Sequence, residues 1–299
     1  MLDDYKSLMN ATSRERTTVR VGGDADLCVE AIGDSAHPAI LLIGAATWSM
    51  DWWEDELCRR LADRGRLVVR YDQRDTGRST SYPPGAPGYT GADLVSDAVT
   101  VLDGLGIVRA HVVGLSMGGG IAQYLALEHR DRLATLTLMS TTPIDPGTEG
   151  LPGMTPELQA TFAEERTEPD WHNRDAVIDH IVEGERPCAG PGNFDEPRLR
   201  AIAGRVFDRT NDITASMTNH FLLDADGPSD PRLSRLEGLP ALVVHGTADP
   251  LFPLAHGRAL ADTIPGARLI ELHDVGHQLP PPHTWERLID TLIDHTAEA

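Results

Sequence analysis

One serine lies between glycines at a spacing that could make it a nucleophile. Residues 111–120 read His-Val-Val-Gly-Leu-Ser-Met-Gly-Gly-Gly; a β-prone apolar run precedes Ser116, and a helical apolar pattern follows Gly120. A strand, a sharp turn and a helix in this order would hold Ser116 in a strained conformation that only small neighbours tolerate. Gly114 and Gly118 lack the Cβ atoms that would clash there, and the helix N-terminus would favour developing negative charge. By itself, the pattern also fits a glycine-rich turn whose serine has no chemical role.

A serine hydroxyl at neutral pH needs a base within hydrogen-bond reach, and that base needs an acid to orient it. Functional residues of an open parallel sheet collect at the carboxyl ends of its strands. Two loops downstream of Ser116 have this position: residues 244–250 contain Asp249, and residues 273–280 contain His277. The sequence therefore predicts a catalytic triad in the order serine, acid, histidine, with Ser116 as nucleophile, Asp249 as orienting acid and His277 as general base.

Other side chains in the same two loops compete for these roles. His245 and His273 are alternative bases, and Asp274 is the alternative acid. His245 follows its strand directly, and His273 ends a strand, where a structural or exposed histidine is expected. Asp274 is too close in sequence to His277 to approach that ring easily from behind. These arguments favour His277 as the base and Asp249 as the acid.

The elements that would position these residues alternate between buried strands and amphipathic helices. Several strand-length runs are apolar throughout, which indicates strands buried on both faces, as in a parallel sheet. The predicted strands are residues 17–21, 27–32, 38–44, 67–71, 110–115, 133–139, 240–245 and 267–272. Helical spacing marks residues 52–64, 93–105, 256–264 and 285–295. This order predicts an α/β fold with a mostly parallel, doubly wound sheet of about eight strands and right-handed crossovers.

The alternation stops between about residues 142 and 238. This stretch contains no strong strand, is punctuated by prolines and glycines, and shows helical patches at residues 157–165, 175–183 and 198–205. About 95 residues without secondary structure would be unusual inside a compact domain, so a helical insertion over the sheet explains the stretch better. We predict an α/β core of residues 1–142 and 239–299 and a helical cap of residues 143–238.

The composition restricts the partners and the location of the protein. The chain has 299 residues and a formal net charge of −20, which opposes binding to nucleic acid or to anionic membrane surfaces. Cys28, Cys58 and Cys188 are far apart and show neither a disulfide framework nor the spacing of a metal site, which favours a reducing compartment. No secretory signal opens the sequence and no apolar run approaches about 18 residues, so we predict a cytoplasmic protein without a membrane span.

Over nearly its whole length the chain resembles the α/β-hydrolase fold superfamily. The matching motifs are Gly-Leu-Ser-Met-Gly at residues 114–118, His-Gly-Thr-Ala-Asp at residues 245–249, Gly-His at residues 276–277, and the loop of residues 71–79. Within the superfamily the sequence resembles the aclacinomycin methylesterase group of polyketide-tailoring esterases. This resemblance rests on residues 70–80, on residues 110–117, and on Asp-Pro at 249–250 followed by Ala-His-Gly at 255–257.

The resemblance implies an oxyanion hole built from two backbone N–H groups. One belongs to Met117, the residue after the nucleophile. The other comes from the loop after Ile43, where this chain reads Gly-Ala-Ala-Thr-Trp at residues 44–48 instead of the usual His-Gly start. Ala46 is the favoured second donor and Ala45 the next candidate, and their small side chains leave room for an acyl group.

Aromatic residues near this loop and in the insertion could line a substrate pocket. Trp48 lies beside the predicted oxyanion loop and is our candidate for a pocket wall, whereas Trp53 is assigned to the core between helix and sheet. Phe221 in the insertion is assigned to the roof of the pocket. The charged loop of residues 72–78 is interpreted as a structural salt-bridge network under the site.

These observations predict a serine-dependent carboxylic ester hydrolase that uses no metal and no cofactor. Attack by Ser116 on the ester carbonyl would give an acyl-enzyme, which a water activated by His277 would hydrolyse. The expected substrate is a bulky, apolar small-molecule ester; by resemblance, it is a polyketide methyl ester or a macrolide lactone. Lactonase and cofactor-free haloperoxidase activities share this triad and are alternatives. A hydrolase-fold protein kept only for ligand binding is the alternative from another class.

Overall fold

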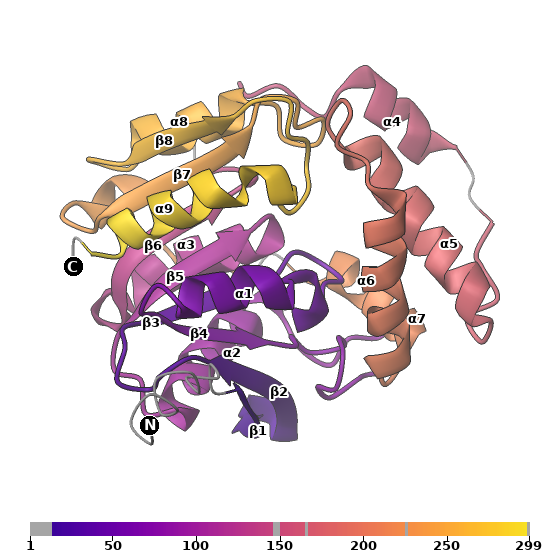
Figure 1. Cartoon of the computed structure of the whole chain (residues 1–299), viewed down its shortest axis with the longest axis horizontal. Helices are drawn as coiled ribbons and strands as arrows, with labels where there is room; N and C mark the ends of the chain where they lie inside the picture. The colour runs from indigo at the N-terminus through magenta and orange to yellow at the C-terminus, as the bar shows by residue number, and fades with distance from the viewer. Residues whose placement is uncertain (1–13, 146–149, 165–166, 225–226, 298–299) are drawn as a thin grey trace, which may run out of the picture.

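A central sheet of eight strands organises the structure, a computed structural model that describes residues 14–145, 150–164, 167–224 and 227–297 (Figure 1). The strands lie side by side in the order β1-β2-β4-β3-β5-β6-β7-β8. They are β1 (Arg14–Val21), β2 (Ala25–Ile32), β3 (Ala39–Ile43), β4 (Leu67–Tyr71), β5 (Ala110–Leu115), β6 (Leu133–Met139), β7 (Ala241–Gly246) and β8 (Arg268–Leu272). Each predicted strand overlaps one of them.

The direction of these strands determines where their loops meet. From β4 through β8 the neighbours pair in parallel, whereas β2 is antiparallel to both β1 and β4. Every residue of β3, β4, β5 and β7 is buried, which explains why these runs are largely apolar instead of alternating. The predicted α/β fold, with its mostly parallel sheet of eight strands, is confirmed.

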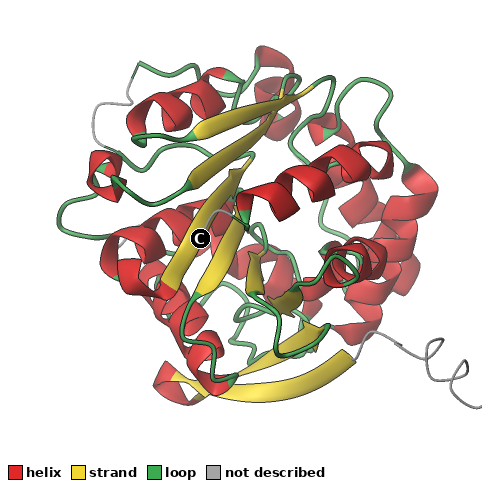
Figure 2. Cartoon of the chain, turned by 60° about the vertical axis from the view of Figure 1, so that its left-hand side comes forward, coloured by secondary structure: helices red, strands yellow, loops and turns green. Residues whose placement is uncertain are grey.

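Helices cover both faces of the sheet, as Figure 2 shows. Successive side chains of a strand point to opposite faces, so Leu41 and Ile43 of β3 join one apolar cluster, and Ile40 and Leu42 join the other. The first cluster is covered by α2 (Gly91–Gly104), α3 (Met117–Glu128) and α8 (Ala255–Thr263). The second is covered by α1 (Asp55–Ala62) and α9 (Trp285–His295).

Within the described part of the chain, four helices lie between β6 and β7, and Figure 1 shows them gathered at one end of the sheet. They are α4 (Pro156–Ala163), α5 (Arg174–Glu185), α6 (Glu196–Arg209) and α7 (Ile213–Thr218). Each begins at a capping side chain that accepts a first-turn N–H group: Thr155, Asn173, Asp195 and Asp212. Short 3-10 turns, η5 (Arg186–Cys188) and η6 (Asn219–Leu222), follow α5 and α7.

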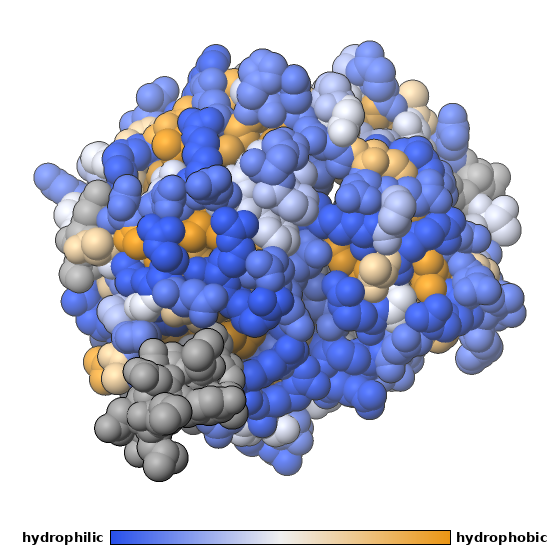
Figure 3. All heavy atoms as spheres, viewed as in Figure 1, coloured by the Kyte–Doolittle hydropathy of each residue, from blue (hydrophilic) through white to orange (hydrophobic). Residues whose placement is uncertain are grey.

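The face shown in Figure 3 is mainly hydrophilic, with apolar residues scattered over it. Such scattered apolar residues are ordinary on a folded surface and need no partner to cover them. In the residues that the structure describes, no helix has the length and apolarity needed to cross a membrane.

The turn between β5 and α3 holds Ser116 at φ 54° and ψ −116°, outside the regions that L-residues prefer. Its N–H donates to the carbonyl oxygen of Met139 at 2.9 Å, which ties the turn to β6. A Cβ atom on Gly114 would lie 2.1 Å from the carbonyl oxygen of Gly118, and one on Gly118 would lie 2.3 Å from that of Ile43. Close backbone contact at the ends of β3 and β5 therefore requires both glycines of the Gly-x-Ser-x-Gly pattern.

We predict that Gly118→Ala lowers the free energy of unfolding by about 1–3 kcal/mol, because the new Cβ would force apart the backbones of α3 and β3. Gly120→Ala is the matched control in the same helix, since a Cβ there would meet no atom within 4 Å. An alanine at this open position should leave stability unchanged or raise it by up to about 1 kcal/mol. Urea unfolding followed by circular dichroism measures both variants, and equal midpoints would contradict this steric account.

Candidate active site

Three side chains from three loops form a hydrogen-bond chain at the carboxyl ends of β5, β7 and β8. Ser116 Oγ lies 2.9 Å from His277 Nε2, and His277 Nδ1 lies 2.9 Å from Asp249 Oδ2. An ionised carboxylate only accepts hydrogen bonds, so Nδ1 carries the imidazole proton and Nε2 can accept from the serine hydroxyl. This arrangement can take a proton from Ser116 and return it, which is the acid–base chemistry that a serine nucleophile needs.

Backbone contacts fix the acid and the histidine of this chain. Asp249 is buried, and its Oδ1 accepts the N–H groups of Leu251 and Phe252 at 2.9 and 2.8 Å, which leaves Oδ2 for His277. The N–H of His277 donates to the carbonyl oxygen of Cys188 at 2.8 Å, so the segment after α5 holds the histidine loop. The rings of Phe252 and His277 meet edge to face with their centroids 5.4 Å apart. These contacts restrict the orientation of the imidazole.

The competing side chains occupy other positions. Nε2 of His245 lies 2.7 Å from the carbonyl oxygen of Phe252 and 3.6 Å from Asp249 Oδ2, and burial lowers the pKa of this histidine. His273 pairs with Asp274 at 2.9 Å, and both side chains are more than half exposed. The structure thus brings His277 to the serine and leaves His273 and Asp274 at the surface.

The residues assigned to the oxyanion hole lie at the junction of β3 with α3. Met117 and Ala46 line the same cavity as Ser116. Met117 is the first residue of α3, where N–H groups lack intrahelical partners and the helix dipole is positive. Ala45 is buried, and its carbonyl oxygen accepts the N–H of Trp48 at 3.2 Å. Ala46 therefore has the more open position of the two alanines.

The next N–H group of this loop is already engaged. Thr47 has φ 67°, and its N–H donates to Nδ1 of His220 in η6 at 2.9 Å. Sequence reasoning missed this contact, because 173 residues separate the two partners and no pattern links them. The contact removes Thr47 from the candidates for the second donor.

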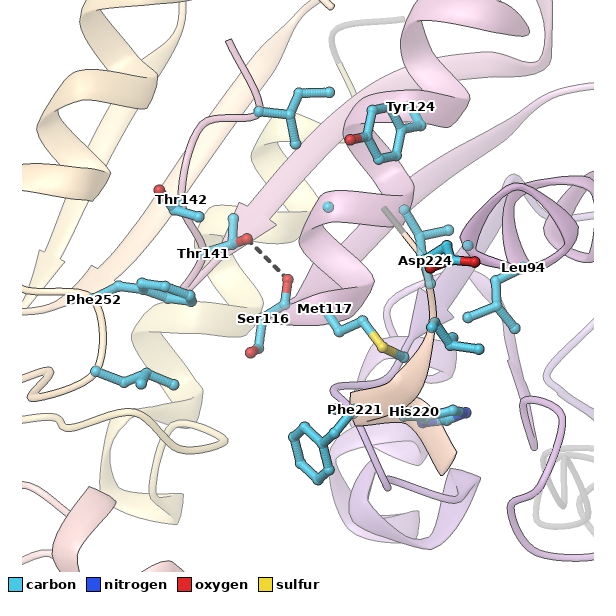
Figure 4. Close-up of a pocket in the computed structure, with 17 residues that line it drawn as sticks. Leu94, Ser116, Met117, Tyr124, Thr141, Thr142, His220, Phe221, Asp224 and Phe252 are labelled. Carbon is cyan, nitrogen blue, oxygen red and sulfur yellow. Dashed lines mark hydrogen bonds between the residues drawn. The ribbon is translucent and has the colours of Figure 1, made fainter. Parts of the chain in front are cut away.

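An apolar cavity of about 410 Å³ opens beside Ser116. Figure 4 shows Phe252 and Thr141 on one side of Ser116, and Met117, Phe221 and His220 on the other. The remaining apolar wall is formed by Leu94, Ile121, Tyr124, Ile144, Leu223 and Leu251. Phe221, assigned to the pocket from the sequence, is 71% exposed and lies on this wall.

A second cavity of about 280 Å³ lies between the oxyanion loop and the insertion. Thr47 of the oxyanion loop lines it, and Phe221 lines both cavities. Glu185 is the acid among its described lining residues. Burial raises the pKa of Glu185 to about 7, and a protonated His277 would lower it. A sequence signal for this residue existed, since Glu185 ends α5, where the helix dipole disfavours a carboxylate.

The structure corrects the assignment of Trp48 to a pocket wall. Trp48 is 5% exposed and stacks on Trp52, with ring centroids 4.6 Å apart and planes at 7°. Both rings belong to the apolar cluster on the α1 side of the sheet, together with Trp53. Two stacked indoles remove more apolar surface from water in this core than Trp48 would at the edge of an open cavity.

The charged loop after β4 lies under the site and is occupied by structural pairs. Asp72 binds Arg209 of α6 at 2.7 and 2.8 Å, and Arg74 binds Asp97 of α2 at 2.7 Å. These two pairs join the loop to α6 on one side and to α2 on the other. Among the residues that the structure describes, no group of three or more His, Cys, Asp or Glu side chains is placed to hold a metal ion.

Comparisons with known proteins identify the family of the chain. A family model described as alpha/beta hydrolase fold matches residues 38–176. Rhodomycin D methylesterase DauP of Streptomyces sp. (strain C5) is 34% identical over 293 residues, which cover 92% of this chain and 96% of that protein. Rhodomycin D methylesterase DnrP of Streptomyces peucetius is 33% identical over 302 residues, which cover 95% of this chain and 99% of that protein.

A solved structure extends the agreement to three dimensions. The enol-lactonase from Burkholderia xenovorans LB400 matches with a TM-score of 0.70 and 27% identity, over 94% of this chain and 100% of that one. Relatives that span almost the whole chain are thus named as hydrolases of ester bonds. The chain is a carboxylic ester hydrolase and belongs to the α/β-hydrolase fold superfamily, in its aclacinomycin methylesterase-like group.

Proposed function

We propose that Ser116, His277 and Asp249 form a catalytic triad that hydrolyses a bulky, apolar carboxylic ester through an acyl-enzyme. One observation carries the proposal: the hydrogen-bond chain from Ser116 Oγ through both nitrogens of His277 to Asp249, beside an apolar cavity. Because the acid lies at Nδ1, the imidazole presents its lone pair to the serine, which is the tautomer that a general base needs.

The proposed reaction has two half-reactions. Ser116 Oγ attacks the ester carbonyl carbon while its proton passes to His277 Nε2, and collapse of the tetrahedral intermediate releases the alcohol with that proton. A water molecule then attacks the acyl-enzyme, gives a proton to Nε2, and the acid leaves as Ser116 regains its hydrogen. Asp249 stabilises the imidazolium that forms in each half-reaction.

Two backbone N–H groups stabilise the oxyanion in this proposal. Met117 supplies one from the N-terminus of α3, where the helix dipole adds to the effect. Ala46 supplies the other, since it lies on the cavity wall, whereas Ala45 is buried and the N–H of Thr47 is bonded to His220.

The proposed substrate is a polyketide methyl ester or a macrolide lactone. Relatives covering nearly the whole chain are named rhodomycin D methylesterases, and a similar solved structure is an enol-lactonase. Cavities of about 410 and 280 Å³ share Phe221 as a wall, which together suit a molecule of several rings. With a lactone, the same steps open the ring and leave the alcohol attached to the acid.

Residues 143–238 act in this proposal as a cap that shapes the substrate site. Phe221 and Leu223 of this segment lie on the wall of the larger cavity, opposite residues of the core. Arg209 of the segment is paired with buried Asp72 of the core, so the cap is held to the loop beneath the site. Substrate choice would then depend on the cap, and bond cleavage on the core.

Ser116→Ala should lower kcat for ester hydrolysis to less than about a hundredth of the wild-type value, because no other group can form the acyl-enzyme. A series of p-nitrophenyl esters of rising chain length measures the loss. Wild type, but not the variant, should be labelled by a fluorophosphonate probe. Ser96→Ala on the exposed side of α2 is the control. A wild-type protein that resists the probe would favour the alternative of a protein that only binds ligands.

Asp249→Asn should keep the fold and slow catalysis by up to about 10⁴-fold, because the amide can stabilise the wrong imidazole tautomer. Asp274→Asn should change kcat less than about threefold, since its carboxylate is exposed and pairs with His273. The comparison is kcat/KM of both variants with one water-miscible ester. A large loss in Asp274→Asn together with a small one in Asp249→Asn would require another acid in the triad.

Glu185→Gln should stabilise the protein relative to wild type as the pH rises from 4.5 to 8. Folding raises the pKa of Glu185 to about 7, from about 4.5 in the unfolded chain. The protonated carboxyl therefore contributes to the stability of the wild-type protein at pH 4.5, and this contribution is lost as the pH rises through 7. The difference in free energy of unfolding should grow by about 1–2 kcal/mol across this range. Glu183→Gln, on the exposed side of the same helix, is the control. Urea unfolding at both pH values tests this, and a constant difference would contradict it.

A further inference from the structure

The loop that supplies the proposed second oxyanion donor is held in a conformation that it would not keep alone. Thr47 follows Ala46 and has φ 67°, in the left-handed region that a β-branched residue rarely adopts. A residue in such a conformation persists only where its surroundings impose it. The contact that involves its own backbone comes from η6 of the insertion, through the side chain of His220.

His220 bridges two loops of the core with its two ring nitrogens. Nδ1 accepts the N–H of Thr47 at 2.9 Å, and Nε2 donates to the carbonyl oxygen of Arg74 at 2.9 Å. A nitrogen that accepts from a backbone N–H carries a lone pair, so the ring is neutral with its proton on Nε2. Burial lowers the pKa of His220, in agreement with a neutral ring.

The loop that contains Arg74, whose carbonyl oxygen accepts from Nε2 of His220, is itself held in place. The guanidinium of Arg74 pairs with buried Asp97 at 2.7 Å and donates to the carbonyl oxygen of Gly22 at 2.8 Å. His220 is therefore fixed at its Arg74 end, and it transmits that position to the backbone of Thr47.

We propose that His220 is a positioning residue for the oxyanion hole, which sets the direction of the Ala46 N–H by holding Thr47 in its left-handed conformation. The proposal rests on the proposed function, since it needs an oxyanion at Ser116. Without His220 the N–H of Thr47 would lose its acceptor and the residue could relax to negative φ, which would turn the Ala46–Thr47 peptide and displace the adjoining N–H of Ala46. Figure 4 shows His220 near Met117, on the side of the cavity opposite Phe252.

The consequence is a specific kinetic signature. Oxyanion contacts are stronger in the transition state than with the bound ester, so a misdirected N–H lowers kcat and leaves KM nearly unchanged. Complete loss of one oxyanion donor costs about 10²–10³-fold in kcat, and a displaced donor should cost about 10–100-fold. A residue that only supported the cavity wall would raise KM instead.

The test compares three substitutions at this site. His220→Phe keeps an aromatic ring of similar size and removes both hydrogen bonds, whereas His220→Gln places its amide near the Nε2 position only. For both variants we expect a kcat about 10–100-fold lower than that of wild type, with KM changed less than about threefold. His220→Asn places its amide oxygen near the Nδ1 position and can accept the N–H of Thr47. It should restore kcat to within about threefold of wild type. If His220→Phe does not fold, the comparison of Gln with Asn carries the same test.

Asn219→Ala is the matched control, because Asn219 anchors the same turn to Asp75 and to the carbonyl oxygen of Pro83 without touching Thr47. Its kcat should stay near wild type. A trifluoromethyl ketone, whose Ser116 adduct places an oxyanion in the hole, should bind His220→Phe more weakly in proportion to kcat/KM. The corresponding secondary alcohol should bind both proteins equally.

The outcomes separate this proposal from the proposed function. An unchanged kcat in His220→Phe, no rescue by Asn, or an equal loss in Asn219→Ala would each overturn the role of His220. Retained hydrolysis in Ser116→Ala would instead overturn the triad itself, whatever the His220 variants do.

Discussion

The close backbone contact between the start of α3 and the end of β3 is the constraint on which the site depends. Glycine at position 118 lets its Cα approach the carbonyl oxygen of Ile43, and glycine at position 114 makes room for the helix. Because Ile43 pairs with Gly114 in adjacent parallel strands, the loop after β3 and the turn after β5 emerge side by side. Ser116, Met117 and Ala46 therefore share one cavity wall, which is the arrangement that the proposed nucleophile and its proposed oxyanion donors require.

The parallel sheet also brings Asp249 and His277 to the edge at which Ser116 lies. β7 and β8 run parallel to β5, so the loops that carry Asp249 and His277 open at the same edge. Asp249 is then held by backbone N–H groups of its own loop, which orients its second oxygen toward the imidazole. The strained φ of Ser116 persists because the buried strand β5 precedes it and helix α3 follows it, and both fix the backbone of the turn.

The insertion takes part in the site beyond covering it. Its segment after α5 accepts the N–H of His277, its helix α6 pairs with the buried Asp72, and its turn η6 hydrogen-bonds to Thr47. Three loops of the core are thus connected to the segment that forms part of the wall of both cavities. The half-buried Glu185 belongs to the same segment, and desolvation raises the pKa of its carboxyl, as is common for carboxyls in functional sites.

The sequence by itself determined the parts of this protein that depend on short-range sterics and on chain order. Apolar runs without alternation specified buried parallel strands, and Gly114, Ser116 and Gly118 specified the sharp turn, because only glycine fits such close contacts. The position of Asp249 and His277 after later strands was sufficient to nominate them, since parallel strands end at one edge. Only the tertiary structure decided that Trp48 stacks on Trp52 in the core, that Thr47 is bonded to His220, and that Glu185 lines a cavity. The burial of the stacked pair, the contact of Thr47 with His220 and the cavity beside Glu185 all depend on packing between segments far apart in the chain, which local periodicity and turn chemistry do not predict.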